Sequence, residues 1–135
     1  MDRVSISRRS EIISNIHSKD TAPEIAIRRL IHSLGYRYRL HSKALPGKPD
    51  LVFAKRKKVI FVHGCFWHMH PNCSKGRPPK SKLEYWLPKL IENRSRDLRL
   101  QRKLSSQKWG VLIVWQCELK DIKKIKYKIV KFLDS

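Results

Sequence analysis

Apolar residues recur at helical intervals in four parts of the chain, and each part is predicted to form a helix. The first is the short stretch 7–16. The second begins at a capping box over residues 21–24, with a proline early in the helix, and it ends at Gly35. Both helices lie in the N-terminal quarter of the chain, ahead of the first predicted strand.

The other two predicted helices lie in the second half of the chain. One opens at a capping box over residues 81–84 and extends to Gly110, and Pro88 is expected to kink or divide it. Asp121 can cap the last helix, whose lysines face outward. The residues expected on the inner faces are Leu90, Ile91, Leu98 and Leu104 in the third helix, and Ile122, Ile125, Ile129 and Leu133 in the fourth.

Four shorter segments have the pattern of strands. Residues 36–40 alternate aromatic and basic side chains, as a half-exposed strand does. The apolar runs 51–54 and 59–62 are separated by a basic turn and should pair as a hairpin. The continuous apolar run 111–115 indicates a central strand buried on both faces. The pattern therefore predicts one α/β domain over residues 1–135, with a small mixed sheet flanked by helices.

Basic residues dominate the charge of the chain. Lys and Arg number 31 against 11 Asp and Glu, a net charge of +20, while 41% hydrophobic residues suffice for a buried core. This charge favours a polyanionic partner, for an enzyme as for a ribosomal or chromatin-like structural protein. The sequence has neither a transmembrane-length apolar run nor the core of a signal peptide. We therefore expect an intracellular protein with no membrane partner.

Residues 59–73 and Cys117 hold the side chains most suited to bind a metal. Cys65, His70 and Cys73 follow the strand 59–62, and Cys117 follows the strand 111–115. Thiolates with an imidazole suit tetrahedral zinc, and four protein ligands make a closed structural site. Spacing alone leaves His68 as an alternative to His70. The alternative to a metal site is three separate buried thiols.

A second group of polar residues lies around the predicted hairpin. Asp50 opens its first strand, His63 closes its second strand, and His68 follows. A carboxylate can hold magnesium beside a phosphate, and histidines can transfer protons near neutral pH. Alone, Asp50 would simply end a turn, Glu24 would be a helix-capping residue and Asp97 a solvated helix charge.

Two aromatic pairs lie next to these groups. Phe66 and Trp67 follow Cys65, and Tyr85 and Trp86 begin the third helix. Aromatic wedges can insert between base pairs and kink DNA, which lowers the cost of distorting a mismatch. Core packing is the alternative, and it is the simpler interpretation of Tyr85 and Trp86 taken alone.

Several motifs resemble those of the very-short-patch-repair (Vsr) mismatch endonucleases in order and spacing. They are Leu45-Pro46-Gly47-Lys48-Pro49-Asp50, the stretch 59–73, Glu84-Tyr85-Trp86, Arg96-Asp97 and the stretch 111–117. The resemblance spans residues 10–118. It implies a core related to that of restriction endonucleases and a magnesium-dependent nick 5′ to the thymine of a T:G mismatch. Such mismatches arise when 5-methylcytosine deaminates.

The resemblance also implies a role for individual residues. Asp50 would ligate the catalytic Mg²⁺ together with the backbone carbonyl of Val62, whose side chain offers no ligand. His63 and His68 would assist proton transfer and phosphate binding, with Asp97 near one of them, and Glu24 would contribute to activity. The residues implied to intercalate are Phe66, Trp67 and Trp86, and those implied to hold a structural Zn²⁺ are Cys65, His70, Cys73 and Cys117.

The implied partners follow from this chemistry. They are double-stranded DNA with a T:G mismatch, contacted also by a basic segment over residues 1–20, and a functional link to a cytosine-5 DNA methyltransferase and repair proteins. An asymmetric mismatch suits a monomer, and the location would be the bacterial cytoplasm at the nucleoid. Two other functions are consistent with the residues: a zinc-stabilised DNA-binding protein without hydrolysis, and a restriction-type endonuclease that cuts paired DNA.

Overall fold

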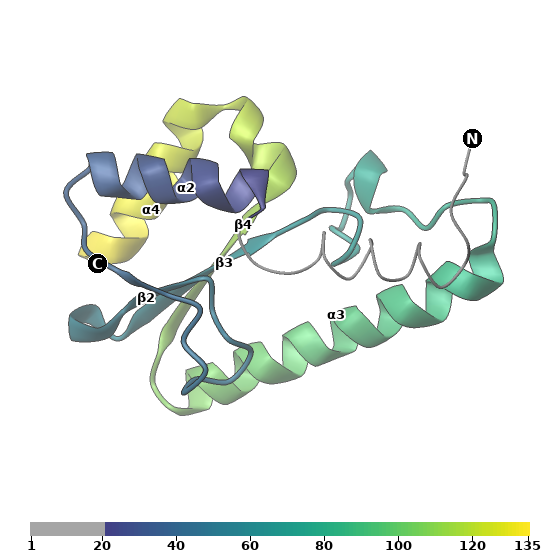
Figure 1. Cartoon of the computed structure of the whole chain (residues 1–135), viewed down its shortest axis with the longest axis horizontal. Helices are drawn as coiled ribbons and strands as arrows, with labels where there is room; N and C mark the ends of the chain where they lie inside the picture. The colour runs from purple at the N-terminus through teal and green to yellow at the C-terminus, as the bar shows by residue number, and fades with distance from the viewer. Residues whose placement is uncertain (1–20) are drawn as a thin grey trace.

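The computed structural model describes residues 21–135, so the helix predicted at 7–16 and the DNA-contacting segment 1–20 lie outside the described residues. This part of the chain contains three α-helices, four strands and three short 3-10 helices (Figure 1). In order they are α2 (Ala22–Ser33), β1 (Arg39–Leu40), β2 (Leu51–Phe53), η1 (Ala54–Arg56), β3 (Lys58–His63), η2 (Ser74–Gly76), α3 (Leu83–Ser106), β4 (Gly110–Trp115), η3 (Gln116–Lys120) and α4 (Ile122–Asp134).

The four strands form one mixed sheet in the order β1-β2-β3-β4. β2 and β3 pair antiparallel as the predicted hairpin, with Leu51 opposite Ile60. β3 and β4 run parallel, and their last residues, His63 and Trp115, are register partners. Because parallel strands end at the same edge of a sheet, the segments that follow β3 and β4 emerge side by side.

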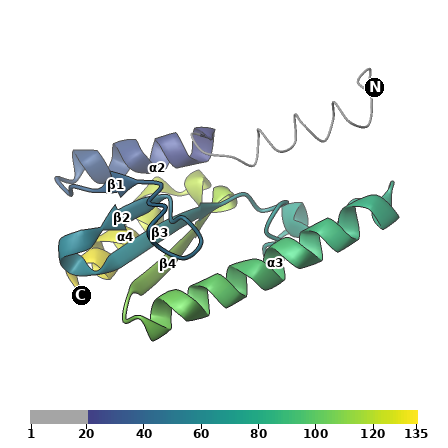
Figure 2. The ribbon, with the colours of Figure 1, turned by 60° about the horizontal axis from the view of Figure 1, so that its bottom comes forward.

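Helices cover both faces of this sheet. Side chains alternate between faces along a strand, and the buried residues accordingly form two clusters. On one face Leu51 and Ile60 pack with buried side chains of α2 and α4, and on the other Val59 and Phe61 pack with Leu104 of α3. Figure 2 shows α2 separated from α3 by the sheet, and in Figure 1 α4 lies on the same side as α2. The predicted α/β architecture, a mixed sheet flanked by helices, is confirmed.

The strand predictions were wrong in two details. The segment 36–40 forms a strand only at Arg39–Leu40, while Tyr36 and Tyr38 pack against the core. The run 111–115 is not a central strand, since β4 is an edge of the described sheet and only Val114 is fully buried. Its continuous apolar sequence reflects the helices that cover both of its faces, and β3 is the strand with a partner on each side.

Helix α3 also departs from its prediction. Ser81 does not cap it: the N-cap is Lys82, which has a left-handed backbone and no side-chain cap bond. Pro88 does not divide the 24-residue helix. The proline removes the hydrogen bond to the carbonyl of Glu84, which lies in the exposed first turn where water can replace the lost donor.

Three leucine and isoleucine residues expected on inner faces are exposed. They are Ile91, Leu98 and Ile122, with exposed fractions of 49%, 42% and 49%. In α3 the inward row instead runs from Leu90 through Asp97 and Gln101 to Leu104. The two polar members of this row line a cleft, which explains why a search for apolar periodicity misplaced this face.

The N-cap residues of α2 and α4 are the predicted ones, Thr21 and Asp121. The hydroxyl of Thr21 accepts a hydrogen bond from the backbone N–H of Glu24 at 3.4 Å, and the carboxylate of Asp121 accepts one from that of Lys124 at 3.1 Å. No helix in residues 21–135 has the length and apolar character needed to cross a membrane.

Candidate active site and metal centre

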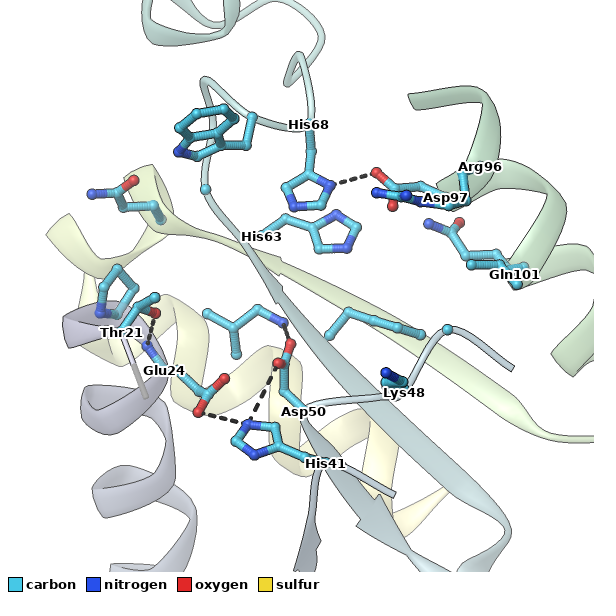
Figure 3. A pocket seen from close by; sticks show the side chains of 18 of the residues that line it. Thr21, Glu24, His41, Lys48, Asp50, His63, His68, Arg96, Asp97 and Gln101 are labelled. Carbon is cyan, nitrogen blue, oxygen red and sulfur yellow. Dashed lines mark hydrogen bonds and ion pairs between the residues drawn. The ribbon is translucent and has the colours of Figure 1, made fainter. Parts of the chain in front are cut away.

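A cleft of about 1050 Å³ opens where β1, β2 and β3 meet the N-terminal end of α2 and the middle of α3. Figure 3 shows its side chains, with Glu24, His41 and Asp50 on one side and His63, His68 and Asp97 on the other. Five of these six residues were singled out in the sequence, and His41 was not. Residues more than 70 positions apart in the chain therefore share one concave site.

Asp50 stands at the start of β2, and its carboxylate is directed into the cleft. Its Oδ2 accepts a hydrogen bond of 2.7 Å from the backbone N–H of Val62 on the neighbouring strand β3. Burial raises the pKa of Asp50 to about 6, although the Val62 N–H and the charge of Arg28 act in the opposite direction. A cation beside this carboxylate would favour its ionised form.

Glu24 is almost completely buried, with 2% of its surface exposed. Its Oε2 accepts hydrogen bonds from Arg28, one helical turn further along α2, and from the Nε2 of His41 at 3.0 Å. His41 Nε2 lies 3.9 Å from Asp50 Oδ1. One nitrogen or oxygen atom from each of Glu24, His41 and Asp50 lies within 4.8 Å of the other two.

The other side of the cleft carries a pair of stacked histidines. The rings of His63 and His68 are 3.7 Å apart at an interplanar angle of 6°. His68 Nδ1 is hydrogen-bonded to Asp97 Oδ2. Because a carboxylate only accepts, Nδ1 carries the hydrogen of this bond. Asp97, expected near one of the two histidines, is thus the partner of His68.

Basic side chains also line the cleft. Lys43 and Lys48 come from the loop between β1 and β2, and Arg96 comes from α3 next to Asp97. Figure 3 shows Arg96 beside Asp97 on α3, and Lys48 on the loop that leads to Asp50. Cations placed beside a carboxylate and histidines suit the phosphates of a nucleic-acid backbone.

A separate cluster of metal-binding side chains lies beyond the end of β3. One ligand atom from each of Cys65, His70, Cys73 and Cys117 lies within 4.8 Å of the other three. His70 Nδ1 is 3.6 Å from Cys65 Sγ and 3.3 Å from Cys117 Sγ. Zinc–sulfur and zinc–nitrogen bonds of about 2.3 and 2.0 Å place tetrahedral ligands about 3.6 Å apart. The four side chains therefore fit zinc, and His68 belongs to the cleft instead.

The loop that carries Cys65, His70 and Cys73 is held by contacts to its own backbone. The guanidinium of Arg94 donates to the carbonyl of Met69 at 3.1 Å. A Cβ on Gly76 would lie 2.3 Å from the carbonyl oxygen of His70, so only glycine fits there. Burial raises the pKa of the Cys65 thiol to about 11 and lowers that of His70.

The aromatic residues Phe66, Trp67 and Trp86 form one cluster between the loop and the start of α3. The ring centroids of Phe66 and Trp67 lie 5.2 Å apart, those of Phe66 and Trp86 5.4 Å, and those of Trp67 and Trp86 5.8 Å. All three are half-buried, and Trp67 also lines the cleft. The cluster therefore borders the cleft through Trp67.

The place of His41, which the sequence did not single out, follows from the pairing of β1 with β2. His41 follows β1, and its backbone N–H donates to the carbonyl of Asp50 at 3.2 Å. Pairing the predicted strand 36–40 with the strand after Asp50 would have placed His41 opposite that aspartate. Its φ of 46° lies in the left-handed region, which costs a residue with a Cβ about 1–2 kcal/mol.

Comparison with known proteins identifies the family of this site. Residues 1–75 match the sequence model of the family described as DNA mismatch endonuclease Vsr. The chain belongs to this Vsr family. A relative in Xanthomonas oryzae pv. oryzae, named type II nicking enzyme V.XorIIP, is 50% identical over 133 residues, which cover 98% of this chain and 97% of that protein. The DNA mismatch endonuclease Vsr of Escherichia coli K12 is 39% identical over 117 residues, 87% of this chain and 74% of that protein.

The fold is shared with a solved endonuclease. The catalytic domain of the homing endonuclease I-Bth0305I matches with a TM-score of 0.59 and 23% identity, covering 84% of this chain and 94% of that domain. The endonuclease-type core predicted from the sequence is therefore confirmed. As a member of the Vsr family, the protein is a DNA endonuclease, and the cleft around Asp50 is its candidate active site.

Proposed function

We propose that this Vsr-family protein makes a magnesium-dependent single-strand nick 5′ to the thymine of a T:G mismatch, which initiates very-short-patch repair. One observation carries the proposal: Asp50, the His63–His68 pair and Trp67 line a single cleft. A metal ligand, proton-transfer groups and a base-stacking side chain are thereby combined in one site. The names of its relatives, a mismatch endonuclease and a nicking enzyme, support the same activity.

The residues present fit a magnesium ion. Asp50 offers a partly buried carboxylate, and its Oδ2 is anchored by the Val62 N–H. Magnesium typically takes one or two protein carboxylates and completes its shell with water and phosphate, so Asp50 with the Val62 carbonyl is a sufficient protein contribution. When bound, the ion would polarise a phosphoryl oxygen and activate a water.

The remaining steps fall to side chains on the other side of the cleft. His68, oriented by Asp97, presents Nε2 and can accept or deliver a proton there. His63 is buried and stacked on His68, so the two rings hold each other in place beside the phosphate. Lys43, Lys48 and Arg96 would bind the backbone phosphates.

A bound zinc ion would stabilise the fold, and the aromatic cluster would contact the DNA. A closed Cys₃His zinc site would tie the loop after β3 to Cys117 in η3. Trp67 lines the cleft, and Phe66 and Trp86 pack against its ring. These three rings would insert beside the mismatch, where the base pair is already weakened.

The proposed partners follow from the asymmetry of this substrate. A T:G pair differs between its two strands, so a monomer suffices to recognise it. Because the thymine arises from 5-methylcytosine, we expect a functional link to a cytosine-5 DNA methyltransferase and to repair proteins in the bacterial cytoplasm, at the nucleoid.

The test compares two aspartate variants. Wild type, Asp50→Ala and Asp121→Ala are incubated with Mg²⁺ and either a T:G duplex or its T:A counterpart, across several flanking sequences. Asp121 caps α4 and does not line the cleft, so its variant controls for the loss of a carboxylate elsewhere. We expect wild type and Asp121→Ala to nick the T:G duplex and Asp50→Ala to leave it intact.

Two outcomes would change the assignment. If Asp50→Ala nicks as fast as wild type, Asp50 is not the metal ligand of the reaction. Cleavage of the T:A duplex at the same rate would instead point to a restriction-type endonuclease acting on paired DNA.

A further inference from the structure

We propose that His41 is a positioning residue that keeps Asp50 oriented toward the catalytic metal, and that Glu24 acts through His41 rather than on the metal itself. This inference rests on the proposed function, because it concerns the metal site of the same cleft. It gives Glu24 a different role from the one that the family resemblance implies.

One carboxylate oxygen of Glu24 is already engaged by groups of the protein. Its Oε2 already accepts hydrogen bonds from Arg28 and from His41 Nε2, and its side chain is 3% exposed. Because a carboxylate only accepts, His41 carries its hydrogen on Nε2 and donates it to Glu24. The buried glutamate is therefore an anchor for the imidazole ring.

The anchored ring lies against Asp50. His41 Nε2 is 3.9 Å from Asp50 Oδ1, and Figure 3 shows the ring between Glu24 and Asp50. The other oxygen of Asp50, Oδ2, is fixed by the Val62 N–H. Because Oδ2 is hydrogen-bonded and the His41 ring lies beside Oδ1, the Asp50 carboxylate is held in one orientation.

The His41 ring also lies close to the guanidinium of Arg28. Arg28 Nη2 lies 3.3 Å from His41 Nε2, and the charge of Arg28 reaches Asp50. A guanidinium that turned toward Asp50 would compete with a metal for the same carboxylate. By occupying the space beside Glu24, His41 keeps Arg28 on Glu24 and leaves Asp50 Oδ1 to the metal.

The backbone supports a functional role for this residue. His41 has a left-handed φ of 46° at the end of the β1–β2 pairing, where its N–H donates to the Asp50 carbonyl. Strained residues persist where the surrounding structure holds them, and they cluster at active sites. Here the strain turns the imidazole into the cleft, toward both carboxylates.

The experiment compares wild type with His41→Leu, which removes the hydrogen bond, and His41→Gln, which keeps an N–H donor. Mn²⁺ binding is followed from the electron paramagnetic resonance signal of the free ion, with and without a T:G duplex that carries an uncleavable linkage at the nick position. We expect the half-saturating Mn²⁺ concentration to rise about 10- to 100-fold in His41→Leu, as for other residues that orient a metal ligand, and to recover largely in His41→Gln.

Kinetics in Mg²⁺ add an independent readout. We expect kcat for nicking to fall in His41→Leu while KM for the duplex stays unchanged, because His41 orients the metal ligand and not the DNA. If His41→Leu proves unfolded by circular dichroism, His41→Asn replaces it, since asparagine tolerates a left-handed backbone and is too short to fill the same space.

Two results would overturn the inference: Mn²⁺ binding in His41→Leu within about twofold of wild type, or a loss in His41→Gln as large as in His41→Leu. The substrate is tested separately. If wild type fails to nick the T:G duplex but Mn²⁺ binding follows the expected order, the proposed substrate is wrong and the role of His41 stands.

Discussion

At the scale of single residues, the site depends on three carboxylates, of which Glu24 is buried and Asp50 and Asp97 are partly buried. Asp50 is anchored by one backbone N–H, Glu24 is shared by Arg28 and His41, and Asp97 orients His68. Each carboxylate thus has a different partner and a different task. Burial without a full set of partners is costly for an ionised group, so the metal-free site should carry a measurable cost in stability.

The cost in folding stability can be measured through the pH dependence of an Asp50 variant. The pKa of Asp50 is raised from the ordinary 3.8 to about 6 in the folded protein, so the folded state binds the proton more tightly. Stability from this group is therefore fully present below pH 4 and is lost as the pH rises through 6. In magnesium-free buffer we expect Asp50→Asn to gain stability relative to wild type on going from pH 4 to pH 7.5, by about 3 kcal/mol at most.

Urea unfolding of both proteins at the two pH values provides the measurement. All other titrating groups, the proposed zinc-binding side chains among them, are the same in both proteins and cancel in the difference. A difference in unfolding free energy that is the same at pH 4 and pH 7.5 would show that burial does not raise the pKa of Asp50.

The sequence predicted most residues of the site but not their pairing. Asp50, His63 and His68 carry chemistry that can be recognised from residue type and position in a hairpin. His41 carries no such signal, because its role depends on a left-handed backbone and on a glutamate 17 positions away. Burial of Glu24 likewise depends on the docking of α2 against the sheet, which no local pattern specifies.

At the scale of elements, the end of β3 organises both sites. His63 closes the strand, and the loop that follows turns back with His68 toward α3 and with Cys65, His70 and Cys73 toward η3. The inner face of α3 carries Asp97 and Gln101 where the apolar pattern would place leucine. This is why sequence periodicity located the helix correctly and misjudged part of its buried face.

Zinc is expected to hold the loop after β3 against η3. Cys117→Ser should reduce bound zinc to well below one ion per chain and lower the melting temperature, because a structural zinc contributes directly to folding. Elemental analysis and thermal unfolding check both effects. Lys120→Ala, an exposed position in the same η3 segment, is the control and should keep its zinc. A wild type that itself binds no zinc would contradict the assignment.

The cap of α4 gives a prediction that separates stability from activity. Asp121→Ala removes the hydrogen bond to the Lys124 N–H, and losing such a cap typically costs about 1 kcal/mol. Chemical denaturation should show this loss, whereas the nicking rate of the folded protein should equal that of wild type. A large fall in nicking rate without a loss of stability would place Asp121 in the active site.

At the scale of the whole molecule, the net charge is +20, but only some of the cations lie where they can contact DNA in the cleft. Lys43, Lys48 and Arg96 line the cleft, whereas Lys126 is exposed on α4 and does not line it. The sequence predicted a polyanionic partner from the total charge. It did not show which cations reach the DNA, because that depends on how the helices pack around the sheet.

Salt dependence of DNA binding distinguishes these cations. For Arg96→Ala we expect weaker duplex binding and a slope of log K against log salt that is smaller by about 0.9, the value for one lost phosphate contact. Lys126→Ala should leave both unchanged. Fluorescence titrations at several salt concentrations provide the data, and equal slopes for wild type and Arg96→Ala would exclude a phosphate contact by Arg96.

The most direct test of the central claim is strand-specific mapping of the product. A duplex with one T:G mismatch is labelled on either strand and incubated with the wild-type protein and Mg²⁺, beside its T:A counterpart. The account predicts a single cut, only in the thymine strand, immediately 5′ to the mismatched thymine. Cleavage of both strands, cleavage of the T:A duplex at the same rate, or an intact mismatched duplex across a range of flanking sequences would contradict it.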